Sequence, residues 1–550
     1  MKKRILVFLM AIVFLGGFLR FWQLASHPVS LHIDEIAIGY NAYSILKTAR
    51  DEHGQLMPLA FRSFGDFKAP VLIYLMTPAL AVFGLNEFGT RFTLALVGTL
   101  TIIFVYLLTK ELTKNEIVSL LASFSLAINP WHIQFSRATF EAILALFLMV
   151  IGVWLFLRAI RLKGKSMSLS ALFFVLSMYS YHGERVVVPI LVLAMAFIFR
   201  QKLWQYRKRT IIAVIVGLIA LLPLFVLMLR PEGSTRAMNE FISRDHEIIG
   251  ELAWSEKFSG ILATVFNNKP LVLFNFWLGR YLDYWDLNFL FFDGTKLTLP
   301  DYPGIGLFHS FEIVLFLLGI WLVFFKGKLL KKESKKILAF WLLIGPLAAS
   351  LAITSQHSLR SLSVIPAPQI LIGFGGFWLF DYLKRQGLFK RLMATTLVIL
   401  VISVSLIYYF DIYYLHFPIH FSEFWSYGMK EMSQSAWQYR DEYEEIVIDP
   451  KLELEGTTMI GAPYLYLLFY GKYDPFLFQN SPRRKIKTED SVDFDKFTFR
   501  EIYWPKDKLR KDTLFIGSPW VIPPDEFDPD WILKEIKFKN GRTAFLMVKT

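Results

Sequence analysis

Runs of apolar residues long enough to cross a bilayer recur along this chain, which has 550 residues. Short clusters of lysine and arginine separate the runs, at residues 2–4, 158–165, 207–209, 326–336 and 384–391. A helix needs about 20 consecutive apolar residues to span a membrane, and the cytoplasmic turns of membrane proteins carry an excess of basic residues. The pattern therefore predicts an α-helical polytopic membrane protein.

The composition agrees with this prediction. Apolar residues make up 55% of the chain and charged residues 19%, which is more apolar than a soluble protein of this length requires. The net charge of +13 comes largely from the basic clusters between apolar runs, and this distribution argues against nucleic acid as a partner. The chain has no cysteine, so disulfides and thiolate metal sites are excluded.

The basic clusters also predict the topology. Lys2, Lys3 and Arg4 place the N-terminus in the cytoplasm, so an uncleaved first span at about 5–22 leads outward. The apolar run at 69–84 is ambiguous, because every later basic cluster would lie outside if it crossed the membrane. We therefore expect it to form a surface helix in the first external loop. Ten further spans are predicted at about 90–109, 117–129, 138–157, 168–181, 186–200, 210–229, 307–325, 337–354, 362–383 and 392–410.

This topology predicts about 11 transmembrane helices in a membrane domain at 1–410. Its external loops lie at 23–89 and 230–306, and the aromatic residues of the second loop suit an interfacial belt or a lid over the substrate. Hydropathy falls after about residue 411, and a small external α/β C-terminal domain is predicted at 411–550. The elements expected in that domain are a helix at 464–470 and strands at 445–449, 513–517 and 543–548.

Unusual polar residues gather on the predicted external side. The adjacent acids Asp34 and Glu35 follow the first span, and Asp66 and Lys68 precede the apolar run at 69–84. Two neighbouring carboxylates near lipid repel each other and lose solvation, which disfavours a purely structural role. The chemistry of this loop suggests a substrate that is half lipid and half polar.

Three further external turns contribute charged residues and histidines. Arg137 and Glu141 are four residues apart and are expected to share a helix face, where a simple surface ion pair is the alternative. For Arg185 and Arg360, the alternative is that their side chains extend to lipid headgroups. For each histidine of these turns, His132, His182 and His357, a hydrogen-bonded structural role is favoured over that of a metal ligand. No motif supports a divalent metal site or another cofactor.

The pattern resembles the bacterial protein O-mannosyltransferase-like glycosyltransferases (glycosyltransferase family 39, near the aminoarabinose transferases), which have the GT-C fold. The resemblance covers the membrane part and is most specific over residues 30–145. The segments that carry it are His32 to Glu35, Phe64 to Pro70, Asn86 to Arg91, Pro130 to His132, Ser136-Arg137 with Glu141, Tyr181-His182 with Arg185, Leu287 to Gly294 and Pro303 to Leu307.

The resemblance implies a sugar on a polyprenyl phosphate as donor and an active site at the external membrane face. It implies that Asp34 is the catalytic carboxylate, that Lys68 contacts the lipid phosphate, and that Glu141 is a second, supporting acid. The chain departs from the aminoarabinose transferases at Phe67, where those proteins carry an acid. Their metal site is therefore not carried over.

Elementary chemistry points the same way. A departing phosphate needs cations, and an acceptor hydroxyl needs a base such as Asp34. One base without a covalent nucleophile gives inversion at the anomeric carbon. The candidates are thus, for catalysis, Asp34, Glu35 and Glu141; for the phosphate, Lys68, Arg137, Arg185 and Arg360; and in support, His32, Asp66, His132, His182 and His357.

The predicted function is a multi-pass glycosyltransferase of the plasma (inner) membrane, with its site and C-terminal domain on the external or periplasmic side. It would move a sugar, by analogy a hexose such as mannose, from a polyprenyl-phosphate donor to a hydroxyl of protein, lipid or glycan. The alternative is a transporter or flippase of lipid-linked sugars. That alternative predicts charges in the middle of spans and inverted repeats with broken helices, and the sequence shows neither pattern.

Overall fold

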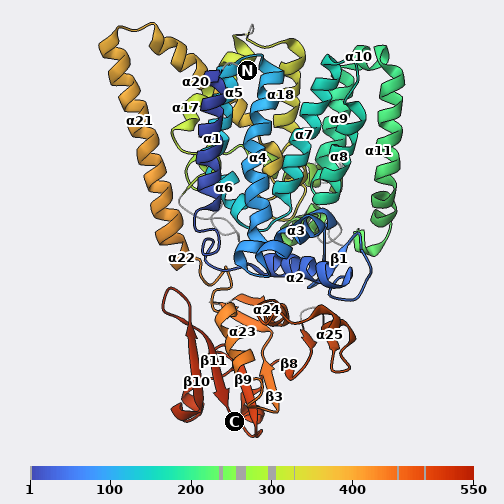
Figure 1. The fold of residues 1–550 in the computed structure, drawn as a ribbon, viewed down its shortest axis with the longest axis vertical. Helices are drawn as coiled ribbons and strands as arrows, with labels where there is room; N and C mark the ends of the chain where they lie inside the picture. The colour runs from blue at the N-terminus through green and yellow to red at the C-terminus, as the bar shows by residue number, and fades with distance from the viewer. Residues whose placement is uncertain are drawn as a thin grey trace. The chain divides into compact units, whose positions relative to one another are not determined.

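The computed structural model places the chain in two compact units (Figure 1). The first comprises Met1–Trp22, Leu94–Ser136 and Glu141–Phe410, and the second comprises Gln23–Thr93, Arg137–Phe140 and Asp411–Thr550. The structure describes residues 3–233, 240–255, 265, 268–294, 305–326, 329–454, 457–488 and 491–550. Pro303 and Gly304 of the family-like segments lie outside the described residues, as does the side chain of Asp66.

The first unit is built mainly from helices. Among the described residues, five helices are long and apolar enough to cross a membrane. They are α1 (Lys3–Phe21), α4 (Glu87–Thr113), α7 (Ala142–Arg161), α11 (Arg207–Met228) and a segment, Leu388–His420, that contains α21 (Leu388–Asp411). Each of them coincides with a predicted span.

Shorter helices occupy the positions of the other predicted spans. They are α5 (Glu116–Ile128), α8 (Met167–Ser180), α9 (Glu184–Ile198), α17 (Glu312–Ile320) with η2 (Trp321–Phe325), α18 (Lys332–Ile344) and α20 (Ala367–Lys384). The connecting elements are α6 (Pro130–Arg137), α10 (Arg200–Gln205), η1 (Ile242–Arg244), α13 (His246–Ser255), α15 (Lys269–Asp283), α16 (Leu287–Phe291), α19 (Leu347–Ser350) and η3 (Leu362–Val364). The number of crossings and their direction stay predictions.

Small residues allow α7 and α8 to pack closely in the first unit. The hydroxyls of Ser170 and Ser177 on α8 donate hydrogen bonds to the carbonyls of Gly152 (2.7 Å) and Ala145 (2.8 Å) on α7. A Cβ atom at Gly152 would lie 2.8 Å from the ring of Phe174. Close approach and polar contacts between helices are typical of packing within a membrane, where apolar burial alone gives little drive for association.

One predicted helix start is wrong. The sequence placed Arg137 and Glu141 on one helix face, with a span beginning at 138. In the structure α6 ends at Arg137 and α7 begins only at Ala142, with a turn between them. The backbone N–H of Thr139 donates to the Glu35 carboxylate at 2.9 Å instead of continuing the helical ladder. This contact explains why the chain leaves the helix here.

The second unit contains the first loop, the 137–140 turn and the last part of the chain. The first loop forms α2 (Ile33–Thr48), a hairpin of β1 (Phe61–Ser63) and β2 (Asp66–Lys68), and α3 (Pro70–Phe83), which is the apolar run expected to be a surface helix. The last part adds η4 (Ile412–His416), α22 (Phe417–His420), α23 (Met429–Gln438), α24 (Pro463–Tyr470), α25 (Pro475–Asn480), α26 (Trp504–Asp507), η5 (Pro524–Glu526) and η6 (Pro529–Trp531).

A five-stranded sheet in the order β10-β11-β9-β3-β8 lies at the core of residues 411–550. Strand β3 runs parallel to β8 and β9, and β11 runs antiparallel to β9 and β10. The predicted strands and helix at 445–449, 513–517, 543–548 and 464–470 are observed as β3, β9, β11 and α24. The sheet strands are β3 (Glu445–Ile448), β8 (Phe497–Phe499), β9 (Thr513–Gly517), β10 (Ile532–Lys537) and β11 (Thr543–Lys549), and two further hairpins are β4 (Lys451–Leu454) with β5 (Thr457–Ile460) and β6 (Lys485–Thr488) with β7 (Ser491–Asp493).

Contacts with α24 and its neighbouring turn hold α2 within the second unit. The Tyr466 hydroxyl donates to the carbonyl of Leu31 at 3.3 Å, and the Tyr40 hydroxyl donates to the carbonyl of Tyr473 at 3.0 Å. A Cβ atom at Gly39 would lie 2.9 Å from the Phe469 ring, so glycine permits this close packing. The compact unit therefore joins the first loop to residues beyond 411, whereas the sequence assigned that loop to the membrane domain.

Candidate active site

The sequence His32-Ile33-Asp34-Glu35 forms the start of α2. The Nδ1 atom of His32 accepts a hydrogen bond from the Asp34 N–H at 3.3 Å, and the Glu35 carboxylate accepts one from the His32 N–H at 3.0 Å. This reciprocal capping satisfies backbone donors that the first helical turn leaves open, and the positive end of the helix favours acids there. Local sequence thus fixes the direction of both acids.

Asp34 forms an ion pair with Lys68. The Lys68 Nζ lies 2.5 Å from Asp34 Oδ1, and the two side chains are 6% and 23% exposed, respectively. Lys68 ends β2, whose hairpin turn at Phe64 and Gly65 has positive φ angles of 22° and 81°. Glycine adopts such angles without strain, so the turn brings the lysine back toward α2. Two predicted site residues, 34 positions apart in sequence, are brought together here.

The electrostatic surroundings keep Asp34 ionised. Burial alone would raise the pKa of the Asp34 carboxyl, but the Lys68 ammonium and His32 outweigh it and hold this pKa well below its usual range. An opposite charge at hydrogen-bond distance has this effect because it stabilises the carboxylate form. Asp34 is therefore an anion that is still partly open to its surroundings.

His32 contacts Asp34 through one ring nitrogen, Nδ1. Its Nδ1 is 3.2 Å from Asp34 Oδ2 and 3.3 Å from the Asp34 backbone nitrogen. An unprotonated Nδ1 accepts from the backbone N–H, whereas a protonated Nδ1 donates to the carboxylate, so the two contacts belong to different protonation states. The rings of Phe140 and Trp425 hold the imidazole at centroid distances of 5.7 and 6.0 Å.

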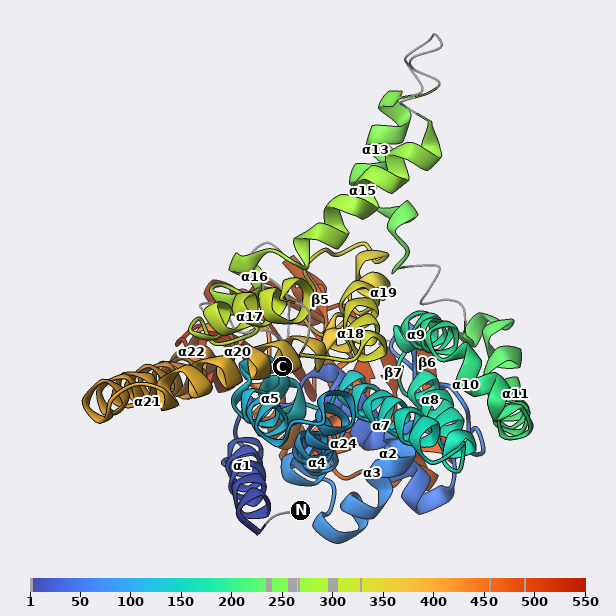
Figure 2. The same cartoon turned by 90° about the horizontal axis from the view of Figure 1, so that it is seen from above.

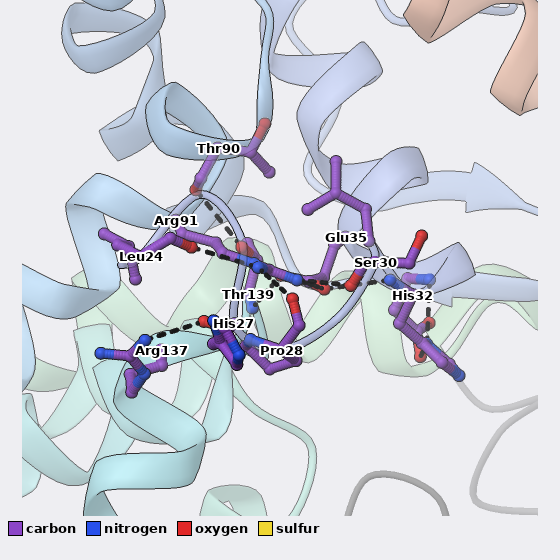
Figure 3. A network of polar contacts seen from close by, with 12 residues as sticks. Leu24, His27, Pro28, Ser30, His32, Glu35, Thr90, Arg91, Arg137 and Thr139 are labelled. Atoms are coloured by element: carbon purple, nitrogen blue, oxygen red, sulfur yellow. Dashed lines mark hydrogen bonds and ion pairs between the residues drawn. The ribbon is translucent and has the colours of Figure 1, made fainter. Parts of the chain in front are cut away.

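Glu35 has a different environment from its neighbour. The side chain is fully buried, and its oxygens accept hydrogen bonds from Arg91 Nε (2.9 Å), Arg91 Nη2 (3.0 Å), the His32 N–H (3.0 Å) and the Thr139 N–H (2.9 Å) (Figure 3). A carboxylate with four donors has its hydrogen-bonding capacity filled. Glu35 thus holds α2, α4 and the 137–140 turn together.

Arg91 completes this network, and the sequence analysis did not identify it as a site residue. Its guanidinium also donates to the carbonyls of Leu24 (3.2 Å), Pro28 (2.9 Å) and Ser30 (2.5 Å). The side chain is completely buried. A signal was present, because an arginine near the start of an apolar helix is costly unless a partner compensates it.

Arg137 also fastens the segment that precedes α2. Its Nε donates to the Tyr413 hydroxyl at 3.1 Å, and its Nη2 donates to the carbonyl of His27 at 3.0 Å (Figure 3). The guanidinium lies 5.4 and 5.7 Å from the ring centroids of Tyr413 and Tyr414. Burial, followed by the charge of Arg137, lowers the pKa of His27 to about 4.

The other predicted site residues belong to the first unit. His132 is buried, and its Nδ1 accepts a hydrogen bond from Arg20 at 2.9 Å. Arg360 donates to Glu240 at 2.7 Å, and Arg185 makes longer contacts with two backbone carbonyls. The remaining members are located at helix boundaries: Glu141 directly before α7, His182 before α9, and His357 before η3.

A second ion pair in the second unit provides a contrast. Lys430 lies 2.7 Å from Glu87, and the side chains are 47% and 16% exposed. Both residues line an open cavity of about 440 Å³ together with Ser30 and Tyr427. The described residues contain no group of three His, Asp or Glu side chains placed to hold a metal ion.

The comparisons with known sequences match part of the chain. A model of the dolichyl-phosphate-mannose-protein mannosyltransferase family matches residues 67–228. YkcB of Bacillus subtilis (strain 168), a candidate mannosyltransferase, is 32% identical over 108 residues. The match spans 20% of this chain and only 15% of the length of that relative.

Solved structures resemble the chain over most of its length. ArnT from Cupriavidus metallidurans bound to undecaprenyl phosphate aligns with a TM-score of 0.54 at 12% identity, covering 100% of this chain and 98% of ArnT. The archaeal oligosaccharyltransferase AglB from Archaeoglobus fulgidus, in complex with an inhibitory peptide and a dolichol-phosphate, aligns with a TM-score of 0.52 at 15% identity. That match covers 85% of this chain and 64% of AglB. The expected GT-C fold and the resemblance to this group are confirmed.

Proposed function

The chain is a GT-C-fold protein that resembles the family 39 glycosyltransferases, and from this premise we propose that it transfers a sugar from a polyprenyl-phosphate donor to an acceptor hydroxyl at the external membrane face. The observation that carries the proposal is the Asp34–Lys68 pair, a partly open carboxylate beside a cation. Two structural neighbours, ArnT and AglB, hold a polyprenyl phosphate in their solved structures, which supports a donor of the same chemical class.

The reaction needs a base and a stabilised leaving group. The acceptor oxygen bonds to the anomeric carbon as its proton passes to the Asp34 carboxylate. The bond between that carbon and the phosphate oxygen breaks with its electron pair, so polyprenyl phosphate leaves with an added negative charge. Lys68 stabilises this charge. Attack opposite the leaving group inverts the anomeric configuration.

The ion pair also suggests how the donor would activate the base. In the structure Lys68 is bound to Asp34 at 2.5 Å, which makes the carboxylate a weak proton acceptor. A donor phosphate that draws the ammonium to itself removes the charge that lowers the pKa of Asp34. The carboxylate then becomes a stronger base only when the donor is in place. This coupling would limit wasteful reaction in the absence of substrate.

Glu35 and Arg91 would act as positioning residues in this scheme. The four donors around Glu35 leave it no capacity to accept a proton from a substrate without breaking the network. Its position next to Asp34 in the first turn of α2 means that it fixes where Asp34 points. We therefore assign catalysis to Asp34 and structural support to its neighbour. The roles of Arg137, Arg185, Arg360 and Glu141 in binding the donor stay predictions.

A donor panel tests the proposal. The purified full chain, reconstituted in vesicles, would be incubated with polyprenyl-phosphate hexoses and pentoses and with cell-envelope fractions, and products identified by mass spectrometry. The proposal expects a new glycosidic bond, with nuclear magnetic resonance showing the anomeric configuration opposite to that of the donor. Movement of intact lipid-linked sugar across the membrane without a new bond would instead support the flippase alternative. Retained configuration would overturn the single-base mechanism.

A further inference from the structure

Helix α15 carries an exposed apolar stripe that the proposed reaction does not use. Phe274, Leu278 and Leu282 are 49%, 36% and 56% exposed. They follow one another at intervals of four residues and so lie along one side of the helix. Val272 and Arg280, on another side, are buried. A row of large apolar side chains exposed along one side of a helix marks an interaction surface.

The buried side of α15 is firmly attached to the first unit. Arg280 donates to the carbonyl of Ala352 at 2.8 Å and forms an ion pair with Asp245. The indole N–H of Trp277 donates to the hydroxyl of Ser350 at 3.1 Å. These contacts fix the rotation of the helix about its axis. The apolar stripe is therefore presented by a defined structure.

The direction of α15 differs from that of the bundle helices. In Figure 2, α5 and α11 of the same unit are seen close to end-on, whereas α13 and α15 extend sideways from the bundle. If the bundle helices cross a membrane, α15 runs along its surface. The Tyr281 hydroxyl donates to the carbonyl of Leu343 at 2.8 Å. Leu343 is itself 58% exposed on α18, a predicted span, so the apolar stripe begins beside an apolar helix surface.

Aromatic residues flank the stripe. The rings of Phe274 and Trp277 have a centroid distance of 5.5 Å, and those of Trp277 and Tyr281 one of 5.6 Å. Tryptophan and tyrosine concentrate where a bilayer meets water, because they present an apolar ring with a polar atom. Asn275 and Gly279, which carry no large apolar side chain, lie beside the stripe and are exposed. Helix α15 thus has one apolar side, and its axis is parallel to the expected membrane surface.

We propose that the Phe274–Leu278–Leu282 stripe binds membrane lipid, with α15 lying in the headgroup boundary of the external leaflet. The three side chains enter the acyl region, and Gly279, about 100° around the helix from the centre of the stripe, lies on the side toward water. An amphipathic helix in this position buries its apolar side a few ångströms below the headgroups, on the order of 5–10 Å. The inference does not depend on the reaction proposed for Asp34.

The absence of cysteine from the chain makes a clean labelling test available. Single variants Phe274→Cys and Leu278→Cys would report on the stripe, with Gly279→Cys as the matched control one residue from Leu278. A side chain at Gly279 meets no atom within 4 Å, so a label fits there without disturbance. Each full-length variant would carry a nitroxide label, be reconstituted in phosphatidylcholine–phosphatidylglycerol vesicles and be measured by electron paramagnetic resonance.

Collision with dissolved oxygen, which concentrates in the acyl region, would be compared with collision with a water-soluble nickel chelate. The proposal expects labels at 274 and 278 to favour oxygen and the label at 279 to favour the chelate. Equal access of the chelate to 278 and 279 would overturn it. Spin–spin broadening at 278 would show a second copy on the stripe, and shielding from both reagents would show another protein surface there. Either result would also overturn the proposal.

Discussion

Asp34 and Glu35 are neighbours in sequence, yet the structure gives them opposite surroundings. Glu35 is completely buried and accepts four hydrogen bonds, whereas Asp34 is 23% exposed and has Lys68 as its paired cation. Successive residues of a helix point about 100° apart, so one acid can face the interior while the next faces an opening. Two adjacent acids can therefore have different roles, one holding the structure together and the other available for chemistry.

The largest effect on stability is expected from substitution of Glu35, the buried acid. Glu35→Gln would leave Arg91 buried without a compensating charge, and loss of one partner of a buried pair costs about 3–5 kcal/mol. Thermal unfolding of the purified protein in detergent measures this loss. Asp34→Asn, one residue away at a more open site, should lower the unfolding temperature less. Equal shifts for the two variants would remove the distinction between the acids.

The Asp34–Lys68 pair is expected to affect donor binding. Lys68→Met removes a hydrogen bond to a charged group, a contribution of about 1.5–3 kcal/mol, and should weaken binding of polyprenyl phosphate roughly 10- to 100-fold. Binding would be measured by titration with a short-chain polyprenyl phosphate. Lys430→Met makes the same change of charge in the same unit and should retain affinity. If both variants bind as well as the wild type, Lys68 does not contact the phosphate.

A smaller effect is expected at His27, beside the same network. Its pKa is lowered from 6.5 to about 4 by burial and by Arg137, so the unfolded chain takes up this proton first as pH falls. Stability contributed by neutral His27 is therefore present above about pH 6.5 and is lost progressively toward pH 4. His27→Asn should flatten the dependence of the unfolding temperature on pH in this window. An unchanged slope would show that His27 is not the group responsible.

The smallest effect is expected at the Glu87–Lys430 pair. Lys430 is 47% exposed, and an ion pair whose cation is solvated by water contributes about 0–1 kcal/mol. Glu87→Gln should therefore leave the unfolding temperature and the transfer rate close to those of the wild type. This variant is the reference for the variants of the Asp34–Lys68 and Glu35–Arg91 pairs. If Glu87→Gln lowered the unfolding temperature as much as Glu35→Gln, exposure would not explain the difference between the Glu87–Lys430 and Glu35–Arg91 pairs.

The sequence predicted the features that depend on local pattern. Hydrophobic runs located α1, α4, α7 and α11, since length and apolar content alone identify such helices. Strand and helix patterns likewise located β9 and α24. The meeting of Asp34 with Lys68 was expected from the family resemblance, and the hairpin at Gly65 supplies its physical cause.

Long-range partners explain what local pattern did not predict. The difference between the two acids depends on Arg91, 56 residues from Glu35, and on Thr139, 104 residues away. No window of sequence contains these contacts. The same Thr139 contact interrupts the helix on which Arg137 and Glu141 were expected to share a face. Helical spacing predicts a shared face for Arg137 and Glu141 only if the helix is continuous between them. The hydrogen bond from the Thr139 N–H to Glu35 replaces a hydrogen bond within the helix, so the prediction fails here.

The central claim is that the Asp34 carboxylate takes the proton of the acceptor. The most direct test is the single-turnover rate of sugar transfer by Asp34→Asn at saturating donor, with Glu87→Gln as the matched control. The account predicts a loss of about 10²–10⁴-fold in a variant that stays folded at the assay temperature. Transfer by Asp34→Asn at the rate of the wild type would contradict it.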